Sequence, residues 1–87
     1  MTPEQCYPHL KAVLEKFDIT VSEQNLANPV VKVQSGFCRV RGKSVYILDK
    51  RLPMRMKCLQ LASFLKQLPL DGIYVMPAVR EYIENAG

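Results

Sequence analysis

The sequence predicts an α+β fold in which a small antiparallel or mixed sheet, built on a β-hairpin, packs against about three helices. Three observations support this class. Apolar residues recur at helical spacing in three segments, residues 37–48 have a hairpin pattern, and the predicted order is helix, strand, hairpin, helix, strand, helix. The length of 87 residues, 48% of them apolar and 23% charged, is typical of one small globular domain. We therefore expect a single domain over residues 1–87.

An apolar stripe predicts the first helix, with members at Tyr7, Leu10, Leu14 and Phe17. Thr2 and Gln5 have capping-box spacing, but Pro8 would then lie inside the helix and remove a hydrogen bond. We therefore expect the regular helix to start near Pro8, after a loose turn. Residues 19–22 alternate apolar and polar side chains and predict a short strand, whereas residues 30–33 fit either a strand or an extended loop.

Residues 37–48 predict a β-hairpin that turns at Gly42 and Lys43. Glycine at the first turn position suits a type II′ turn, because only glycine takes the required positive φ without strain. The corresponding register pairs Arg41 with Ser44 and continues outward along both strands. It separates an apolar face from a more polar one; the apolar face holds Cys38, Val40, Val45 and Ile47. We expect this apolar face to pack on the helix that follows.

The second helix is predicted to begin near Pro53 and to stop at Pro69. It carries a wide apolar stripe that includes Met54, Cys58, Leu61, Leu65 and Leu68. Residues 73–75 read as a short edge strand. Pro77 then opens a last helix, whose inward residues are expected to be Val79, Tyr82, Ile83 and Ala86.

The net charge of +4 is unevenly distributed, because residues 32–57 hold eight basic side chains and one acidic one. One interpretation is a solvated surface on which the two signs meet in the fold. The alternative is a binding patch for nucleic acid or another polyanion, using Arg39, Arg41, Lys43, Lys50, Arg51, Arg55 and Lys57. Nucleic-acid binders usually add stacking aromatic residues, and only Phe37 and Tyr46 lie near these cations.

The sequence contains no recognisable catalytic or metal-binding pattern. Cys6 and His9 have a spacing that metal ligands can use, and Cys38 and Cys58 could complete a set of four. Structural zinc ligands usually come in close pairs, however, and the last two cysteines lie on apolar stripes, so we interpret the thiols as core residues. We expect no catalytic residues, no metal and no cofactor. The N-terminus lacks a secretory signal pattern, and no apolar run reaches membrane-spanning length, so a cytoplasmic protein with no membrane contact is expected.

Residues 36–67 resemble the core of the ImmA/IrrE-type metallopeptidases, in which a β-hairpin leads into a helix carrying Leu-Ala-His-Glu-Leu-Gly-His. Residues 61–67 read Leu-Ala-Ser-Phe-Leu-Lys-Gln in this chain. The two zinc histidines correspond to Ser63 and Gln67, and the catalytic glutamate to Phe64. The resemblance therefore implies an inactive relative that kept the scaffold. The chain also resembles small bacterial proteins that end in a Pro-Ala-Val-Arg-Glu segment (residues 77–81 here), which implies no activity.

These observations predict a non-enzymatic module for protein interaction or self-association. The candidate interaction surface is the outer hairpin face, with Phe37, Arg39, Arg41, Tyr46 and Leu48. Interfaces favour arginine and aromatic side chains together. The alternative function is a nucleic-acid-binding module that uses the basic segment of residues 32–57.

Overall fold

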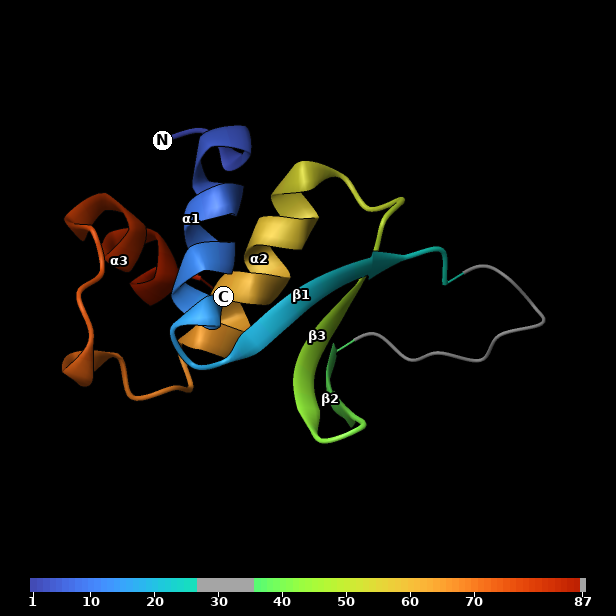
Figure 1. The fold of residues 1–87 in the computed structure, drawn as a ribbon. Helices are drawn as coiled ribbons and strands as arrows, with labels where there is room; N and C mark the ends of the chain where they lie inside the picture. Colours follow the sequence, from blue (N-terminus) through green and yellow to red (C-terminus); the bar gives the residue numbers. More distant parts are fainter. Residues whose placement is uncertain (27–35, 87) are drawn as a thin grey trace.

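The computed structural model describes residues 1–26 and 36–86 and has the predicted α+β architecture (Figure 1). In chain order, the elements are α1 (Pro3–Glu15), β1 (Ile19–Gln24), β2 (Gly36–Val40), β3 (Lys43–Asp49), α2 (Met54–Leu65), a 3-10 helix (Leu70–Gly72) and α3 (Pro77–Glu84). No helix within the described ranges is long and apolar enough to cross a membrane.

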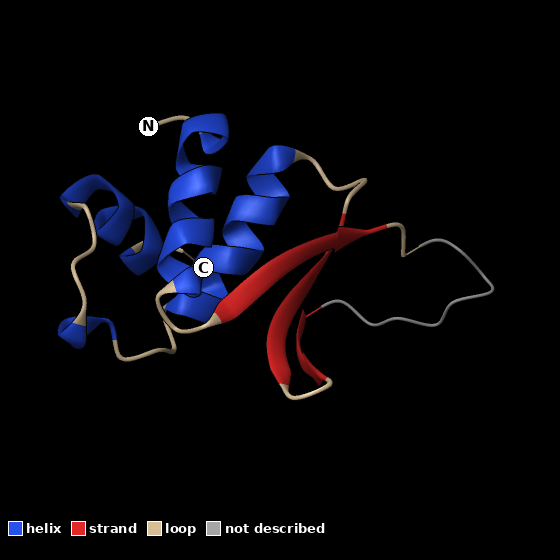
Figure 2. Cartoon of the chain, in the orientation of Figure 1, coloured by secondary structure: helices blue, strands red, loops and turns tan. Residues whose placement is uncertain are grey.

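The three strands form one mixed sheet in the order β1-β3-β2. β1 pairs with β3 in parallel, and β2 pairs with β3 antiparallel. The α-helices gather on one side of this sheet, and the turn between β2 and β3 projects away from them (Figure 2). The core lies between the helices and the sheet face that they cover. β2 and the hairpin turn are the parts of the sheet farthest from the helical layer.

Helix α1 starts at Pro3, five residues before the predicted start, so the expectation of a loose turn up to Pro8 is wrong. Thr2 caps the helix, because the backbone N–H of Gln5 donates to Thr2 Oγ1 at 3.2 Å and the Thr2 N–H donates to Gln5 Oε1 at 3.1 Å. Pro8 lies inside the helix on its exposed side. The bond that Pro8 removes thus faces solvent, and burial of Cys6 and Tyr7 stabilises the first turns.

The predicted hairpin exists, but its turn lies one residue earlier. Val40 pairs with Lys43, so the two turn residues are Arg41 and Gly42 rather than Gly42 and Lys43. Their φ angles of 53° and 79° are those of a type I′ turn, not the predicted type II′. Relative to the predicted pairing of Arg41 with Ser44, the strand register is shifted by two residues. Because side chains alternate between faces with a period of two, this shift leaves the predicted sets of residues on each face unchanged.

The hairpin faces the helices with the side opposite to the predicted one. Tyr46 is 8% exposed and Leu48 is completely buried, and both belong to the core cluster. Cys38, Val40, Val45 and Ile47 lie outside this cluster, although Ile47 itself is only 5% exposed. The reason is β1, whose apolar Ile19 and Val21 are in register with Ser44 and Tyr46. Ile19 and Val21 thus lie on the same sheet face as Tyr46, and they make this face more apolar than the opposite one.

The predicted strand at residues 19–22 and the predicted last helix from Pro77 are confirmed. The second helix begins one residue after Pro53 but ends at Leu65, so the prediction that it continues to Pro69 is wrong. Residues 73–75 do not form a strand; they follow the 3-10 helix as unpaired chain, from which Val75 enters the core. The expected strand or extended loop at residues 30–33 lies outside the described residues.

The turn makes a specific stability prediction, because Arg41 adopts the left-handed conformation that asparagine tolerates better. Replacing Arg41 with asparagine creates the Asn-Gly pair preferred in type I′ turns. We expect the free energy of unfolding to rise by about 0.5–1 kcal/mol, measured by urea denaturation. Lys43→Asn is the control, since Lys43 is a strand residue and should gain nothing. Unchanged or lower stability of Arg41→Asn would contradict the turn assignment.

Candidate functional site

The structure divides the predicted interaction surface into exposed and buried members. Phe37, Arg39 and Arg41 are exposed, as expected. Tyr46 and Leu48 are buried on the helix side of the sheet and are therefore unavailable to a partner. The prediction of an outer face with all five residues is wrong for these two, because the hairpin packs with the opposite face inward.

β2 exposes one large apolar side chain on each face of the sheet. Four large apolar side chains are exposed in the described part of the chain, and two of them are on this strand: Phe37 at 47% and Val40 at 48%. Sequence reasoning missed Val40 because it assigned this residue to the face covered by the helix. Val40 lies on the face away from the helices, and the pattern of the hairpin alone carried no signal for this, because the choice of face depends on the pairing of β1 with β3.

Phe37 is held in place by an aromatic cluster. Its ring stacks on that of Phe64 in α2, with centroids 5.4 Å apart and an interplanar angle of 18°. Phe64 also contacts the ring of Tyr46, at 5.0 Å between centroids. Burial raises the pKa of the Tyr46 hydroxyl, so this residue stays neutral in the cluster. One side of the Phe37 ring is thus supported by the core while about half of the residue remains exposed.

The backbone of β2 also has a free edge. β2 is the last strand of the sheet order, and no other described strand pairs with its second edge. A two-residue hairpin closes with a hydrogen-bonded pair, here Val40 and Lys43, and such pairs alternate along an antiparallel ladder. The alternation directs the N–H and C=O groups of Phe37 and Arg39 away from β3, toward the free edge.

The basic residues predicted for polyanion binding do not gather into one patch. Lys57 is 7% exposed and pairs with Glu23, and Arg51 pairs with Asp49. The five others divide between the two ends of β3: Arg39, Arg41 and Lys43 lie at the hairpin turn, and Lys50 and Arg55 follow the strand. Seven strand residues span roughly 20 Å, so the two groups are well separated.

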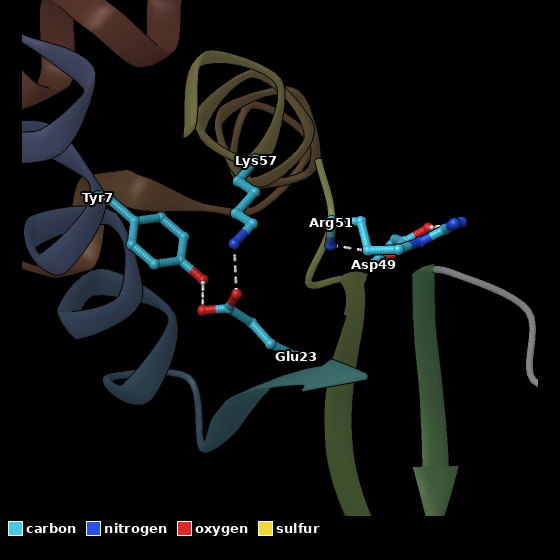
Figure 3. A network of polar contacts seen from close by, with 5 residues as sticks. All are labelled: Tyr7, Glu23, Asp49, Arg51 and Lys57. Carbon is cyan, nitrogen blue, oxygen red and sulfur yellow. Dashed lines mark hydrogen bonds and ion pairs between the residues drawn. The ribbon is translucent and has the colours of Figure 1, made fainter. Parts of the chain in front are cut away.

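Lys57 belongs to a polar network that joins α1, β1 and α2 (Figure 3). Its Nζ donates to Glu23 Oε1 at 2.5 Å, and the Tyr7 hydroxyl donates to Glu23 Oε2 at 2.8 Å. The hydrogen bond from Lys57, helped by that from Tyr7, lowers the pKa of Glu23. Burial and the bond to Glu23 raise the pKa of Tyr7. Both carboxylate oxygens are engaged, so the network ties the sheet to two helices.

Asp49 and Arg51 form a second, local contact after β3 (Figure 3). Asp49 Oδ1 accepts the backbone N–H of Arg51 at 2.9 Å, and Oδ2 accepts from the guanidinium at 3.1 Å. The side-chain and backbone bonds from Arg51 lower the pKa of Asp49. This contact orders the turn that leads from the sheet into α2.

Two of the three thiols pack in the core, as predicted. Cys6 and Cys58 are fully buried, and Cys58 Sγ donates to the carbonyl oxygen of Pro3 at 3.2 Å. Burial raises the pKa of Cys6 and raises that of Cys58 to about 11, which keeps both thiols protonated. Among the residues that the structure describes, no three His, Cys, Asp or Glu side chains gather as metal ligands would.

A hollow of about 450 Å³ lies between the N-terminus, α2 and α3. Its polar lining comes from Glu81, Tyr82 and Asn85. Glu81 and Asn85 are exposed to solvent, so the hollow gathers no buried polar group.

The positions compared with the metallopeptidase motif lie in three different environments. Ser63 is half-buried, Phe64 is part of the aromatic cluster, and Gln67 is exposed beyond the end of α2.

A scan against protein-family models, a search of the curated proteins and a search of the solved structures each found no match.

Proposed function

We propose that this chain is a protein-interaction module that binds an extended segment of a partner protein along the free edge of β2. The observation that carries the proposal is the exposure of Phe37 and Val40 on an edge strand whose outward backbone groups have no described strand partner. Strand addition uses both features, since backbone hydrogen bonds supply affinity and side-chain contacts supply specificity.

The other edge of the sheet differs in character. β1 presents Thr20, Ser22 and Gln24 on the face away from the helices, so this edge offers a partner no large apolar side chain on that face. β2 exposes two apolar side chains instead. Support from Phe64 positions Phe37 before any partner arrives, which reduces the ordering that binding would require.

Self-association is one version of this function, with a second copy as the partner. Light scattering on the size-exclusion peak tests it over a range of concentrations. A strict monomer at the highest concentration would remove the self-association version and leave a different protein as partner.

A peptide selection with the full chain as bait tests strand addition directly. Random linear peptides displayed on phage are selected on the immobilised protein, and the enriched peptides are measured against two variants, Arg39→Pro and Arg39→Thr. Both variants lose the charge, but only proline removes the outward N–H. We expect Arg39→Pro to bind at least about tenfold more weakly than Arg39→Thr, because a backbone hydrogen bond contributes on the order of 1 kcal/mol and the proline ring obstructs pairing.

Thermal melts of both variants serve as the folding control, and comparable melting temperatures are expected because the β2–β3 bonds are retained. Equal affinity of the two folded variants, or the absence of any enriched peptide, would contradict strand addition at β2.

A further inference from the structure

We infer that the segment received by β2 is acidic; this inference rests on the proposed strand addition. Three cations, Arg39, Arg41 and Lys43, lie within five residues at the hairpin turn, and residues 36–48 contain no acidic side chain. All three are exposed, and none forms an ion pair with another residue that the structure describes. The turn end of the binding edge therefore carries uncompensated positive charge.

The cations lie on both faces of the sheet near the free edge, with Arg39 on β2 itself and Lys43 on the neighbouring strand β3. Arg39 shares a face with Phe37, and Lys43 shares the opposite face with its pair partner Val40. Each exposed apolar residue therefore has a cation on its own side of the sheet. An acidic side chain of the added strand opposite Arg39 would meet an opposite charge across the strand pair, which is favourable. On the other face, an acidic side chain beside Val40 would be attracted to Lys43 from one strand farther away.

The acid that precedes β1 does not cancel this charge. Asp18 directly precedes Ile19, which pairs with Ser44, so Asp18 lies on the β1 side of β3. The free edge of β2 is on the other side of β3. Even if Asp18 is counted with the turn, the group retains a net positive charge.

Other occupants fit the edge less well. A second copy would bring its own Arg39, Arg41 and Lys43 to the same edge, and like charges on paired strands are unfavourable. A single-stranded nucleic acid requires a platform of several stacking rings, but Phe37 is the only exposed aromatic residue of β2 and Phe64 already covers one side of its ring. An acidic protein segment matches both the apolar side chains and the cations.

The inference is tested by titrating the full chain with three probes. Two are peptides of equal length, one alternating valine with glutamate and one alternating valine with threonine, and the third is an oligodeoxythymidine. We expect the glutamate peptide to bind at least about tenfold more tightly than the threonine peptide, because several exposed charge pairs add together. The affinity of the glutamate peptide should fall as salt is added, because salt screens exposed charges.

Charge-reversal variants locate the contact. Arg39→Glu combined with Lys43→Glu should weaken binding of the glutamate peptide at least about tenfold. Lys50→Glu combined with Arg55→Glu makes the same change in net charge at the other end of β3, and it should alter affinity by less than about threefold. Melting temperatures of both double variants show whether each is folded.

The outcomes separate this inference from the proposed function. If the glutamate and threonine peptides bind equally well and both require the N–H of Arg39, the acidic partner is wrong and strand addition stands. If neither peptide nor any selected peptide binds β2, both are wrong. Tight oligodeoxythymidine binding that is lost in the turn variant, or a dimer that is disrupted by Arg39→Pro but not by Arg39→Thr, would replace the acidic segment with nucleic acid or with a second copy.

Discussion

Replacing Leu48 with alanine is expected to lower the free energy of unfolding by about 3 kcal/mol. Leu48 is completely buried between the sheet and the helices, so its truncation removes apolar contacts and leaves a cavity in the core. Domains of this size have a net stability on the order of 5 kcal/mol, so more than half of the stability should be lost. Urea denaturation followed by circular dichroism measures the change.

Val45→Ala is the matched control on the same strand. Val45 is half-buried on the sheet face away from the helices, and its truncation should lower the free energy of unfolding by about 1 kcal/mol. A larger loss at Val45 than at Leu48 would show that the opposite hairpin face packs on the helices.

Removing the Glu23 carboxylate is the second change with a large expected effect. In Glu23→Ala, Lys57 keeps its charge at an interface where it is only 7% exposed, and the Tyr7 hydroxyl loses its acceptor. We expect the free energy of unfolding to fall by about 2 kcal/mol, which is less than for a fully buried pair because the Glu23 side chain is 33% exposed.

A double-mutant cycle with Lys57→Met isolates the interaction. Methionine keeps the length of the side chain and removes the charge, so the double variant should be more stable than the sum of the single changes predicts, by about 1 kcal/mol. Additive changes would show that the pair contributes nothing beyond packing.

The same carboxylate predicts a pH dependence. The hydrogen bonds from Lys57 and Tyr7 lower the pKa of Glu23 in the folded chain below its ordinary value of 4.5. The stability contributed by the ionised form is therefore present above pH 4.5 and is lost as the pH falls toward the folded-state pKa. Denaturation curves between neutral pH and pH 3 should show a smaller decline in Glu23→Gln than in the unmodified chain.

The candidate surface could be predicted from the sequence only in part. Alternation along residues 37–41 placed Phe37, Arg39 and Arg41 on one face, and all three are exposed. The same pattern could not show that Tyr46 would be covered by Phe64, which is 18 residues away in the chain. The exposure of Val40 likewise depends on which hairpin face the helices cover, and Val40 lies on the uncovered face.

The arrangement of the basic residues also could not be predicted from the sequence alone. Lys57 was grouped with six other cations because all lie between residues 32 and 57, but its helix position aims it at Glu23 of β1, and the two form an ion pair. Charge counted along a chain does not record which charges meet in space.

The sequence by itself determined that helices begin near Met54 and Pro77, that a strand begins at Ile19, and that the hairpin exists. Each of these depends on the period of apolar side chains and on turn residues within the same segment. Tertiary structure decided which hairpin face is buried, because both faces carry apolar residues and the choice depends on the register of β1 against β3. It also decided the start of α1, where burial of Cys6 and Tyr7 outweighs the hydrogen bond lost at Pro8. Local patterns specify what each segment forms, whereas contacts between distant segments determine which side of each element becomes the interior.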